Sequence, residues 1–100
     1  MEDKLGVGSA LNSIGGIYYE TGQYSKALKF FQQALVSVRK AQSSLEEANN
    51  LNGIGLVYSE LGQYSQALKF YQQALAIWEK LVTKKVKPRL FITLALLITR

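Results

Sequence analysis

The sequence of 100 residues contains no cysteine and no histidine. Without cysteine there can be no disulfide, no thiol nucleophile and no thiolate metal site. Without histidine the chain lacks the usual general base of enzymes and the commonest metal ligand in proteins. We therefore expect no enzymatic activity, no bound cofactor and no metal.

Charged residues are also scarce, at 19%, whereas hydrophobic residues make up 48% of the chain. This balance argues against a disordered protein. One hundred residues are enough for one small domain with a modest core. The first eight residues lack the apolar stretch of a signal peptide, so we expect a cytoplasmic protein.

The net charge of +5 is concentrated towards the C-terminus. Residues 1–50 carry five basic and five acidic side chains, whereas six basic residues and no acidic one occur from Lys80 onward. A basic run of this kind could contact phosphates or an anionic surface. It has no interleaved aromatic residues to stack on bases, so a solvated connection is expected, with neither nucleic acid nor a membrane as partner. The candidate phosphate contacts are Lys84, Lys85, Lys87 and Arg89.

What the sequence does contain is an internal repeat. Residues 11–35 read LNSIGGIYYETGQYSKALKFFQQAL and residues 51–75 read LNGIGLVYSELGQYSQALKFYQQAL, so 18 of 25 positions are identical after a shift of 40. A repeat of this length is the signature of a stacked helical array. Apolar residues recur at helical spacing on both sides of Gly22 and of Gly62, which predicts an antiparallel helix pair in each repeat.

The same spacing predicts which positions are buried. Gly15 and Gly55 fall in the middle of helices, where glycine costs about 1 kcal/mol relative to alanine, so we expect helices to approach closely there. Phe31 and Tyr71 would fill space one turn further on, and the Gln42-Ser43-Ser44 connection would cap the next helix. The predicted core positions are Leu11, Ile14, Tyr18, Tyr24, Ala27, Leu28, Phe31, Ala34, Leu35 and Val38, then Leu51, Ile54, Tyr58, Tyr64, Ala67, Leu68, Tyr71, Ala74, Leu75 and Trp78.

This pattern, seen twice in register, resembles the tetratricopeptide repeat. The period of 40 rather than about 34 is similar to the longer variant of kinesin-light-chain-like and bacterial scaffolds. The family's usual first tryptophan and late proline are absent from both repeats. The resemblance implies an all-α fold, a right-handed α-solenoid of antiparallel helix pairs that binds proteins. The positions that carry it are Leu11, Ile14, Gly15, Tyr18, Gly22, Tyr24, Ala27, Phe31 and Ala34, with their counterparts Leu51, Ile54, Gly55, Tyr58, Gly62, Tyr64, Ala67, Tyr71 and Ala74.

The chain is then one domain over residues 1–100. Repeat one covers about 3–41, repeat two about 43–81, and a partial third repeat of one helix about 88–99. A further shift of 40 residues aligns the segment 88–99 with the first helix of each repeat, and the residues at the core positions of that segment are apolar or small. Pro88 suits the first turn of this predicted helix.

The predicted fifth helix is apolar on all sides, and such a helix is normally buried. Because nothing else in the chain can cover it, the simplest interpretation is self-association as a dimer or a domain-swapped dimer. A truncated or altered tail and a membrane contact are the alternatives, although Leu90–Thr99 would form only about 15 Å of helix, too short to span a bilayer. The candidate self-association residues are Phe91, Ile92, Leu94, Leu96, Leu97 and Ile98.

The first helix of each pair has a second face beside the one that points to the core. In similar arrays the corresponding positions line a concave groove that holds a peptide or helix. The resemblance implies the same role here. Asn12 and Asn52 lie one repeat apart, and their amides could grip the main chain of an extended peptide or simply be solvated. Glu20 and Glu60 recur on this face, too far apart for an acid–base pair. The predicted groove residues are Ser9, Asn12, Gly16, Tyr19, Asn49, Asn52, Leu56 and Ser59.

Three hypotheses for function follow. The leading one is a protein–protein interaction scaffold that holds a peptide or helix in the groove and self-associates through its last helix. The second is a structural self-assembling unit, possibly domain-swapped, with no separate ligand. The third is a module that binds phosphate or an anionic surface through the basic run Lys80–Arg89.

Overall fold

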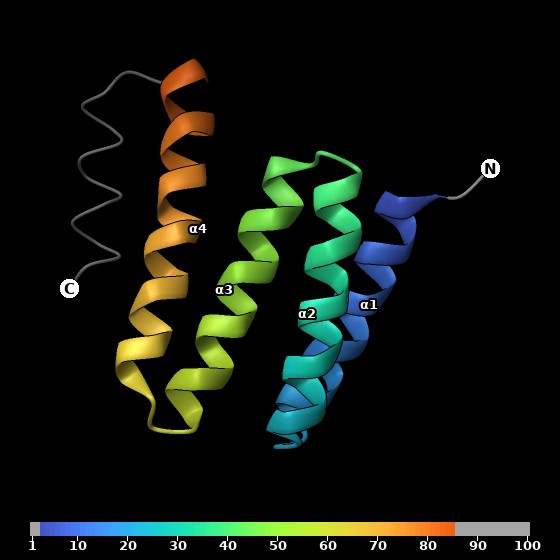
Figure 1. The fold of residues 1–100 in the computed structure, drawn as a ribbon, viewed down its shortest axis with the longest axis vertical. Helices are drawn as coiled ribbons and strands as arrows, with labels where there is room; N and C mark the ends of the chain where they lie inside the picture. Colours follow the sequence, from blue (N-terminus) through green and yellow to red (C-terminus); the bar gives the residue numbers. More distant parts are fainter. Residues whose placement is uncertain (1–2, 86–100) are drawn as a thin grey trace.

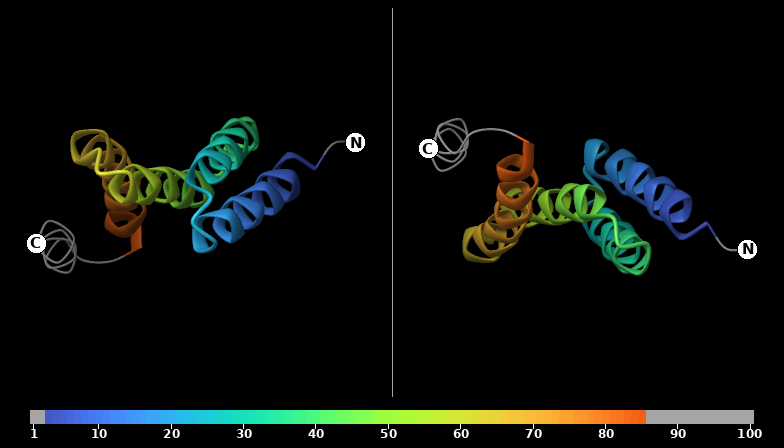
Figure 2. Two further views of the ribbon diagram at one scale, coloured as in Figure 1. Left: turned by 90° about the horizontal axis from the view of Figure 1, so that it is seen from below. Right: turned by 90° about the horizontal axis from the view of Figure 1, so that it is seen from above.

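The computed structural model describes the backbone of residues 3–85 and the side chains of residues 3–82. Successive helices run antiparallel and form a zigzag when viewed along their length (Figures 1 and 2). The described chain is therefore an all-α solenoid of two helix pairs, as the sequence predicts. Its helices are α1 (Lys4–Glu20), α2 (Tyr24–Lys40), α3 (Ser44–Glu60) and α4 (Tyr64–Lys85).

Each helix pair turns at a glycine. Gly22 and Gly62 have φ angles of 78° and 77°, in the left-handed region that favours glycine. The N–H of Gln23, the residue after Gly22, donates to the carbonyl of Tyr18 at 2.8 Å and so satisfies an end group of α1. The predicted positions of both turns are confirmed.

The turn between the two pairs is built differently. Gln42 takes the left-handed conformation, with φ of 57°, which the sequence does not indicate because glutamine rarely adopts it. Ser43 occupies the N-cap of α3 as predicted, but its side chain makes no capping hydrogen bond. Its carbonyl instead accepts the N–H of Glu47 at 2.9 Å. The connection therefore relies on backbone geometry rather than on a serine cap.

The mid-helix glycines allow the close helix approach that the sequence predicts. A Cβ atom on Gly15 would lie 2.8 Å from Cδ1 of Phe31, and one on Gly55 would lie 2.6 Å from Cε1 of Tyr71. The Phe31 ring is also close to Gly53, whose Cβ would lie 3.1 Å from Cε1. The ring of Phe31 therefore lies between α1 and α3.

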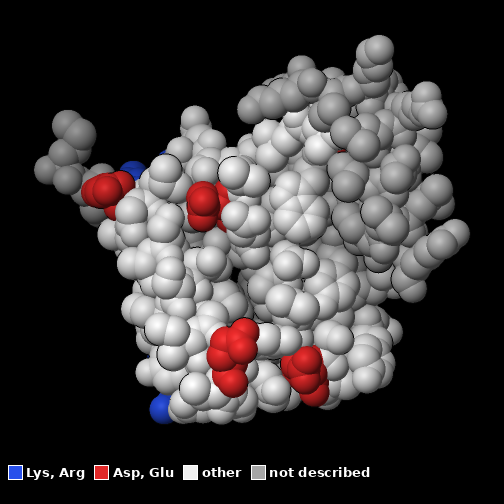
Figure 3. Space-filling view, turned by 180° about the vertical axis from the view of Figure 1, so that it is seen from behind, with Lys and Arg blue, Asp and Glu red and all other residues white. Residues whose placement is uncertain are grey.

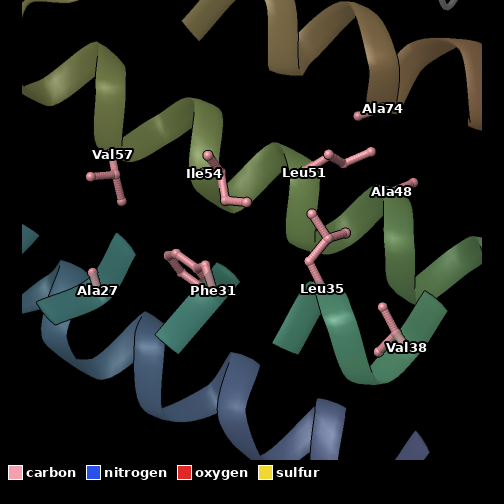
Figure 4. Close-up of a cluster of buried hydrophobic side chains, with 9 residues drawn as sticks. All are labelled: Ala27, Phe31, Leu35, Val38, Ala48, Leu51, Ile54, Val57 and Ala74. Carbon is pink, nitrogen blue, oxygen red and sulfur yellow. The ribbon is translucent and has the colours of Figure 1, made fainter. Parts of the chain in front are cut away.

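The main hydrophobic core lies where α3 packs on α2, and Figure 4 shows the side chains of these helices pointing towards each other. Leu51 and Ile54 are each 1% exposed, and burying a side chain of this size stabilises a fold by about 1.5–3 kcal/mol. The core residues are Ala27, Phe31, Leu35 and Val38 from α2, Ala48, Leu51, Ile54 and Val57 from α3, and Ala74 from α4.

An aromatic stack recurs in both helix pairs. The rings of Tyr18 and Phe30 lie 5.4 Å apart between centroids, and those of Tyr58 and Phe70 lie 5.5 Å apart. Both pairs are close to parallel, at 16° and 10°. The sequence repeat is thus also a repeat of packing geometry.

Three predicted core residues are exposed instead, and all of them lie at the ends of the array. Ile14 is 38% exposed, whereas Ile54, its counterpart one repeat later, is 1% exposed. Tyr64 and Leu68 of α4 are 70% and 55% exposed. Within residues 3–85, α1 and α4 each have a neighbouring helix pair on one side only, so these positions lack the neighbour that would bury them.

The last described helix is longer than the sequence predicts. α4 has 22 residues against 17 in each of the other helices, and it continues past the expected end of the second repeat near residue 81. No glycine or proline interrupts the segment 81–85. Lys84 and Lys85 therefore belong to a helix and not to a connection. The predicted helix at 88–99, its self-association residues, Lys87 and Arg89 lie outside the described residues.

Candidate binding surface on α1 and α3

All eight predicted groove residues lie on α1 or α3, two helices that contact each other directly. None of them is buried. Those on α1 are all half-buried, and those on α3 are half-buried or exposed. We call this set the inner face; its members are Ser9, Asn12, Gly16 and Tyr19 on α1, and Asn49, Asn52, Leu56 and Ser59 on α3.

Two neighbouring glycines show where packing ends and the inner face begins. Gly15 is buried against the ring of Phe31, so a side chain there would collide with it. A Cβ atom on Gly16 would meet no other heavy atom within 4 Å. The surface of α1 is therefore open at Gly16, and this glycine has no packing role that explains it.

A hydrogen bond joins the ends of the two helices. The hydroxyl of Tyr19 donates to Oε1 of Glu60 at 3.2 Å, and the ring of Tyr24 lies 5.8 Å from the Tyr19 ring between centroids. The sequence pattern places Tyr19 and Glu60 on the same face but does not predict this contact. The repeat could not reveal it, because the counterpart of Tyr19 in the second repeat is Ser59.

Two tyrosines near Glu60 hold their protons more tightly than usual. Burial raises the pKa of Tyr19 above its ordinary value of 10.0, and the hydrogen bond to Glu60 and the charge of that carboxylate raise it further. Burial also raises the pKa of Tyr71; its hydrogen bond with Ser59 acts in the opposite direction and the charge of Glu60 in the same one. Both phenols are therefore neutral at neutral pH. We call Tyr19, Ser59, Glu60 and Tyr71 the Glu60 cluster.

α3 and α2 carry charges of opposite sign, whereas α1 carries one basic and one acidic residue. α3 carries three acidic residues (Glu46, Glu47 and Glu60) and no basic one, whereas α2 carries four basic residues and no acidic one. Figure 3 views the molecule from behind, the side on which α1 lies. On the described part of that surface Asp and Glu are spread over the face, and Lys and Arg are seen only at its margin. Glu47 is paired with Nε of Arg39 at 2.9 Å. The inner face therefore lies in an acidic surface.

A shallow pocket of about 350 Å³ lies at the other end of α3, away from the Glu60 cluster. None of the predicted groove residues lines it. Its lining residues are Ser44, Glu47, Ile77, Lys80 and Leu81.

Residues 3–85 provide neither a cluster of metal ligands nor a helix that could span a membrane. This part of the chain holds no group of acidic side chains able to bind a metal ion. Among its helices, none combines the length and apolar character needed to cross a membrane.

Comparison with known proteins identifies the repeat. The family model described as tetratricopeptide repeat matches residues 6–80, which include nearly all of both helix pairs. No curated protein and no solved structure matches the chain. Repeats of this family generally mediate protein–protein interactions and act as non-enzymatic scaffolds.

Proposed function

Because the chain belongs to the tetratricopeptide-repeat family, we propose that it is a protein–protein interaction module that holds a peptide or a helix on the inner face. One observation carries this proposal: eight residues that are not buried lie on two adjoining helices, and among them only Tyr19 packs against the core. The residues expected to contribute most are Asn12, Tyr19, Asn49, Asn52 and Leu56.

The two amides support an extended ligand. Asn12 and Asn52 are half-buried, lie one repeat apart, and make no side-chain hydrogen bond with other residues of the described part. Asparagine is a poor helix former, so neither residue is there to favour the helix. An amide side chain both donates and accepts, which matches the alternating groups of a peptide main chain.

The Glu60 cluster supports a ligand with a basic residue. Tyr19 orients the Glu60 carboxylate from the opposite helix, and α3 has no basic residue to neutralise it. A lysine or arginine on the ligand would form a charge-assisted hydrogen bond, roughly twice as strong as a neutral one. Tyrosine is also among the side chains that contribute most at protein interfaces.

The test begins with a peptide library displayed against the full chain, followed by affinity measurements on the peptide selected. The double variant Asn12→Ala/Asn52→Ala should bind about tenfold more weakly, since each lost hydrogen bond is worth about 0.5–1.5 kcal/mol. The matched control is Gln33→Ala/Gln73→Ala, which removes two exposed amides that also lie one repeat apart but on α2 and α4. Equal affinity in both double variants, or a library that yields no binder, would refute the proposal.

The remaining sequence-based hypotheses stay proposals. Self-association through Phe91–Ile98 predicts that deletion of residues 90–100 converts an oligomer to a monomer. Phosphate binding predicts that replacing Lys84, Lys85 and Lys87 by Glu abolishes binding to phosphate-bearing surfaces and that binding weakens steeply with salt. A cytoplasmic location also stays a proposal.

A further inference from the structure

The two ends of the described array expose residues that its interior buries. Ile17 of α1 is 63% exposed, whereas Val57, its counterpart on α3, is fully buried. At the other end, Leu68 of α4 is 55% exposed, whereas Leu28, its counterpart on α2, is half-buried. The exposed side of α1 therefore corresponds in sequence to the side of α3 that packs on α2. In the same way, the exposed side of α4 corresponds to the side of α2 on which α3 packs.

These two surfaces are related by the repeat itself. The junction between α2 and α3 joins the end of one repeat to the start of the next, and 18 of 25 positions are identical between the repeats. A chain whose α1 lay on the α4 of another copy would continue the same packing. We propose that a second copy of this chain is the partner of these surfaces, with its α1 docked on α4 as α3 is docked on α2.

Most of the residues that would meet at this new junction are apolar, like those of the junction between α2 and α3. Ser13 takes the place of Gly53, which lies close to the Phe31 ring, and Tyr71 takes the place of Phe31. One hydroxyl is thus added on each side of a contact that is already tight, since a Cβ atom on Gly53 would lie 3.1 Å from Cε1 of Phe31, so the new junction requires a small shift of the ring or of the helices there. The bulkier Ile17 takes the place of Val57, so the apolar centre is retained.

One replacement removes a buried polar atom that is present on α3. Asn50 is fully buried; its Nδ2 donates to the Glu46 carbonyl at 2.9 Å, but its Oδ1 has no hydrogen-bond partner. A buried acceptor without a partner is destabilising. Its counterpart on α1 is Ala10, which buries no polar side-chain atom.

Another replacement removes a favourable contact. At the new junction Glu79 would take the place of Arg39 and Val7 the place of Glu47, so the ion pair between Arg39 and Glu47 has no counterpart there. Pairs between exposed side chains contribute little to stability, so its loss does not prevent the junction. The contact joins two different surfaces and does not close on itself, so copies would add end to end as concentration rises. It does not use the eight residues of the inner face, although Tyr71 of the Glu60 cluster lies in it, and its test needs no bound peptide.

The test uses the full chain and two single variants, Ile17→Lys and Leu68→Lys, in light scattering on a sizing column over a wide concentration range. The unmodified chain should gain mass with concentration. Each variant alone should stay monomeric, with self-association weakened by about tenfold or more, because every junction needs both surfaces. The control is Val36→Lys, which places the same charge at a 55% exposed position on α2 and should associate like the unmodified chain. Ile17 and Leu68 are both exposed, so their replacement should not unfold the chain. Circular dichroism checks that the variants remain folded.

An equimolar mixture of the two variants is the decisive sample. The Ile17→Lys chain keeps an intact α4 surface and the Leu68→Lys chain keeps an intact α1 surface. They should therefore form a complex of two chains that grows no further. A mixture that stays monomeric would overturn the proposal, as would a monomeric unmodified chain, which is expected if residues 86–100 occupy α4. Self-association by Leu68→Lys alone would also overturn it, because association would then not need an intact α4 surface.

Discussion

The ring of Phe31 lies against the backbone of Gly15, so close that a Cβ atom on the glycine would stand 2.8 Å from Cδ1 of the ring. The same ring is close to Gly53 on α3. Phe31 is itself only 5% exposed. The side chain of Phe31 therefore sets the distance from α2 to both α1 and α3. Gly15 is required because a side chain there would collide with the ring, not because the backbone turns at this position.

The first prediction contrasts the two neighbouring glycines of α1. Gly15→Ala should lower the free energy of unfolding by about 1–2 kcal/mol, because overpacking costs about 1–3 kcal/mol and the gain in helix propensity offsets part of it. Gly16→Ala should raise it by about 0.5–1 kcal/mol, because the new methyl group meets open space. Urea unfolding of both variants measures the difference. Similar shifts in the two variants would contradict this account of Gly15.

Most of the fold could be predicted from the sequence, because it is encoded in short-range patterns that occur twice. The spacing of apolar residues predicts the helices, Gly22 and Gly62 predict the turns, and Gly15 predicts a close helix contact. The predictions are incomplete where burial depends on a neighbour: Ile14 and Leu68 fit the core pattern but are exposed at the ends of the described array. A local pattern cannot indicate whether a neighbouring helix pair is present.

The candidate surface was predicted less completely. Helical periodicity placed all eight residues of the inner face on α1 and α3 at positions that are not buried, and their contact with a ligand stays a prediction. It did not predict the hydrogen bond from Tyr19 to Glu60, which joins residues 41 positions apart and has no counterpart elsewhere in the repeat. It also assigned Tyr71 to the core alone, although Ser59 and Glu60 both influence the pKa of its hydroxyl. A contact that is made in only one of the two repeats cannot be predicted by comparing the repeats.

A second prediction concerns the buried amide of Asn50. Asn50→Ala removes an acceptor that has no partner, together with one hydrogen bond to a helix carbonyl. These effects oppose each other, so the free energy of unfolding should change by less than about 1 kcal/mol despite full burial. Leu51→Ala, at the next position and also buried, should cost about 2–5 kcal/mol. Thermal and urea unfolding distinguish the two. A large loss of stability in Asn50→Ala would indicate that Oδ1 has a partner in solution, such as bound water.

A third prediction concerns stability at high pH. The pKa of Tyr19 and that of Tyr71 are raised in the folded chain, so the folded state holds these protons more tightly than the unfolded state does. The resulting contribution is fully present below pH 10.0, the ordinary value, and is lost as pH rises through the raised values. The unfolding free energy should therefore fall above that pH. Absorbance titration at the phenolate band should show two tyrosines ionising late.

The matched variants for the pH effect are Tyr19→Phe and Tyr64→Phe. Tyr19→Phe should reduce the loss of stability at high pH, because the late-ionising phenol is gone. Tyr64 is 70% exposed and lies outside the Glu60 cluster, so Tyr64→Phe is the control for loss of a phenol elsewhere in the chain. Identical profiles in the two variants would mean that Tyr19 ionises like an exposed phenol and is not held by Glu60.

The last prediction concerns the charge of the ligand. If the inner face binds a basic segment, the peptide selected against the full chain should contain lysine or arginine, and its affinity should fall as salt rises. Glu60→Gln keeps the shape of the side chain and an acceptor for Tyr19 but removes the charge, so it should weaken binding by about three- to tenfold and flatten the salt dependence. Glu79→Gln, on α4 and outside the inner face, is the control for a general change in net charge. Equal effects of the two substitutions would assign the salt dependence to the overall field of the protein, whereas a selective effect of Glu60→Gln would identify its carboxylate as the group that contacts the ligand.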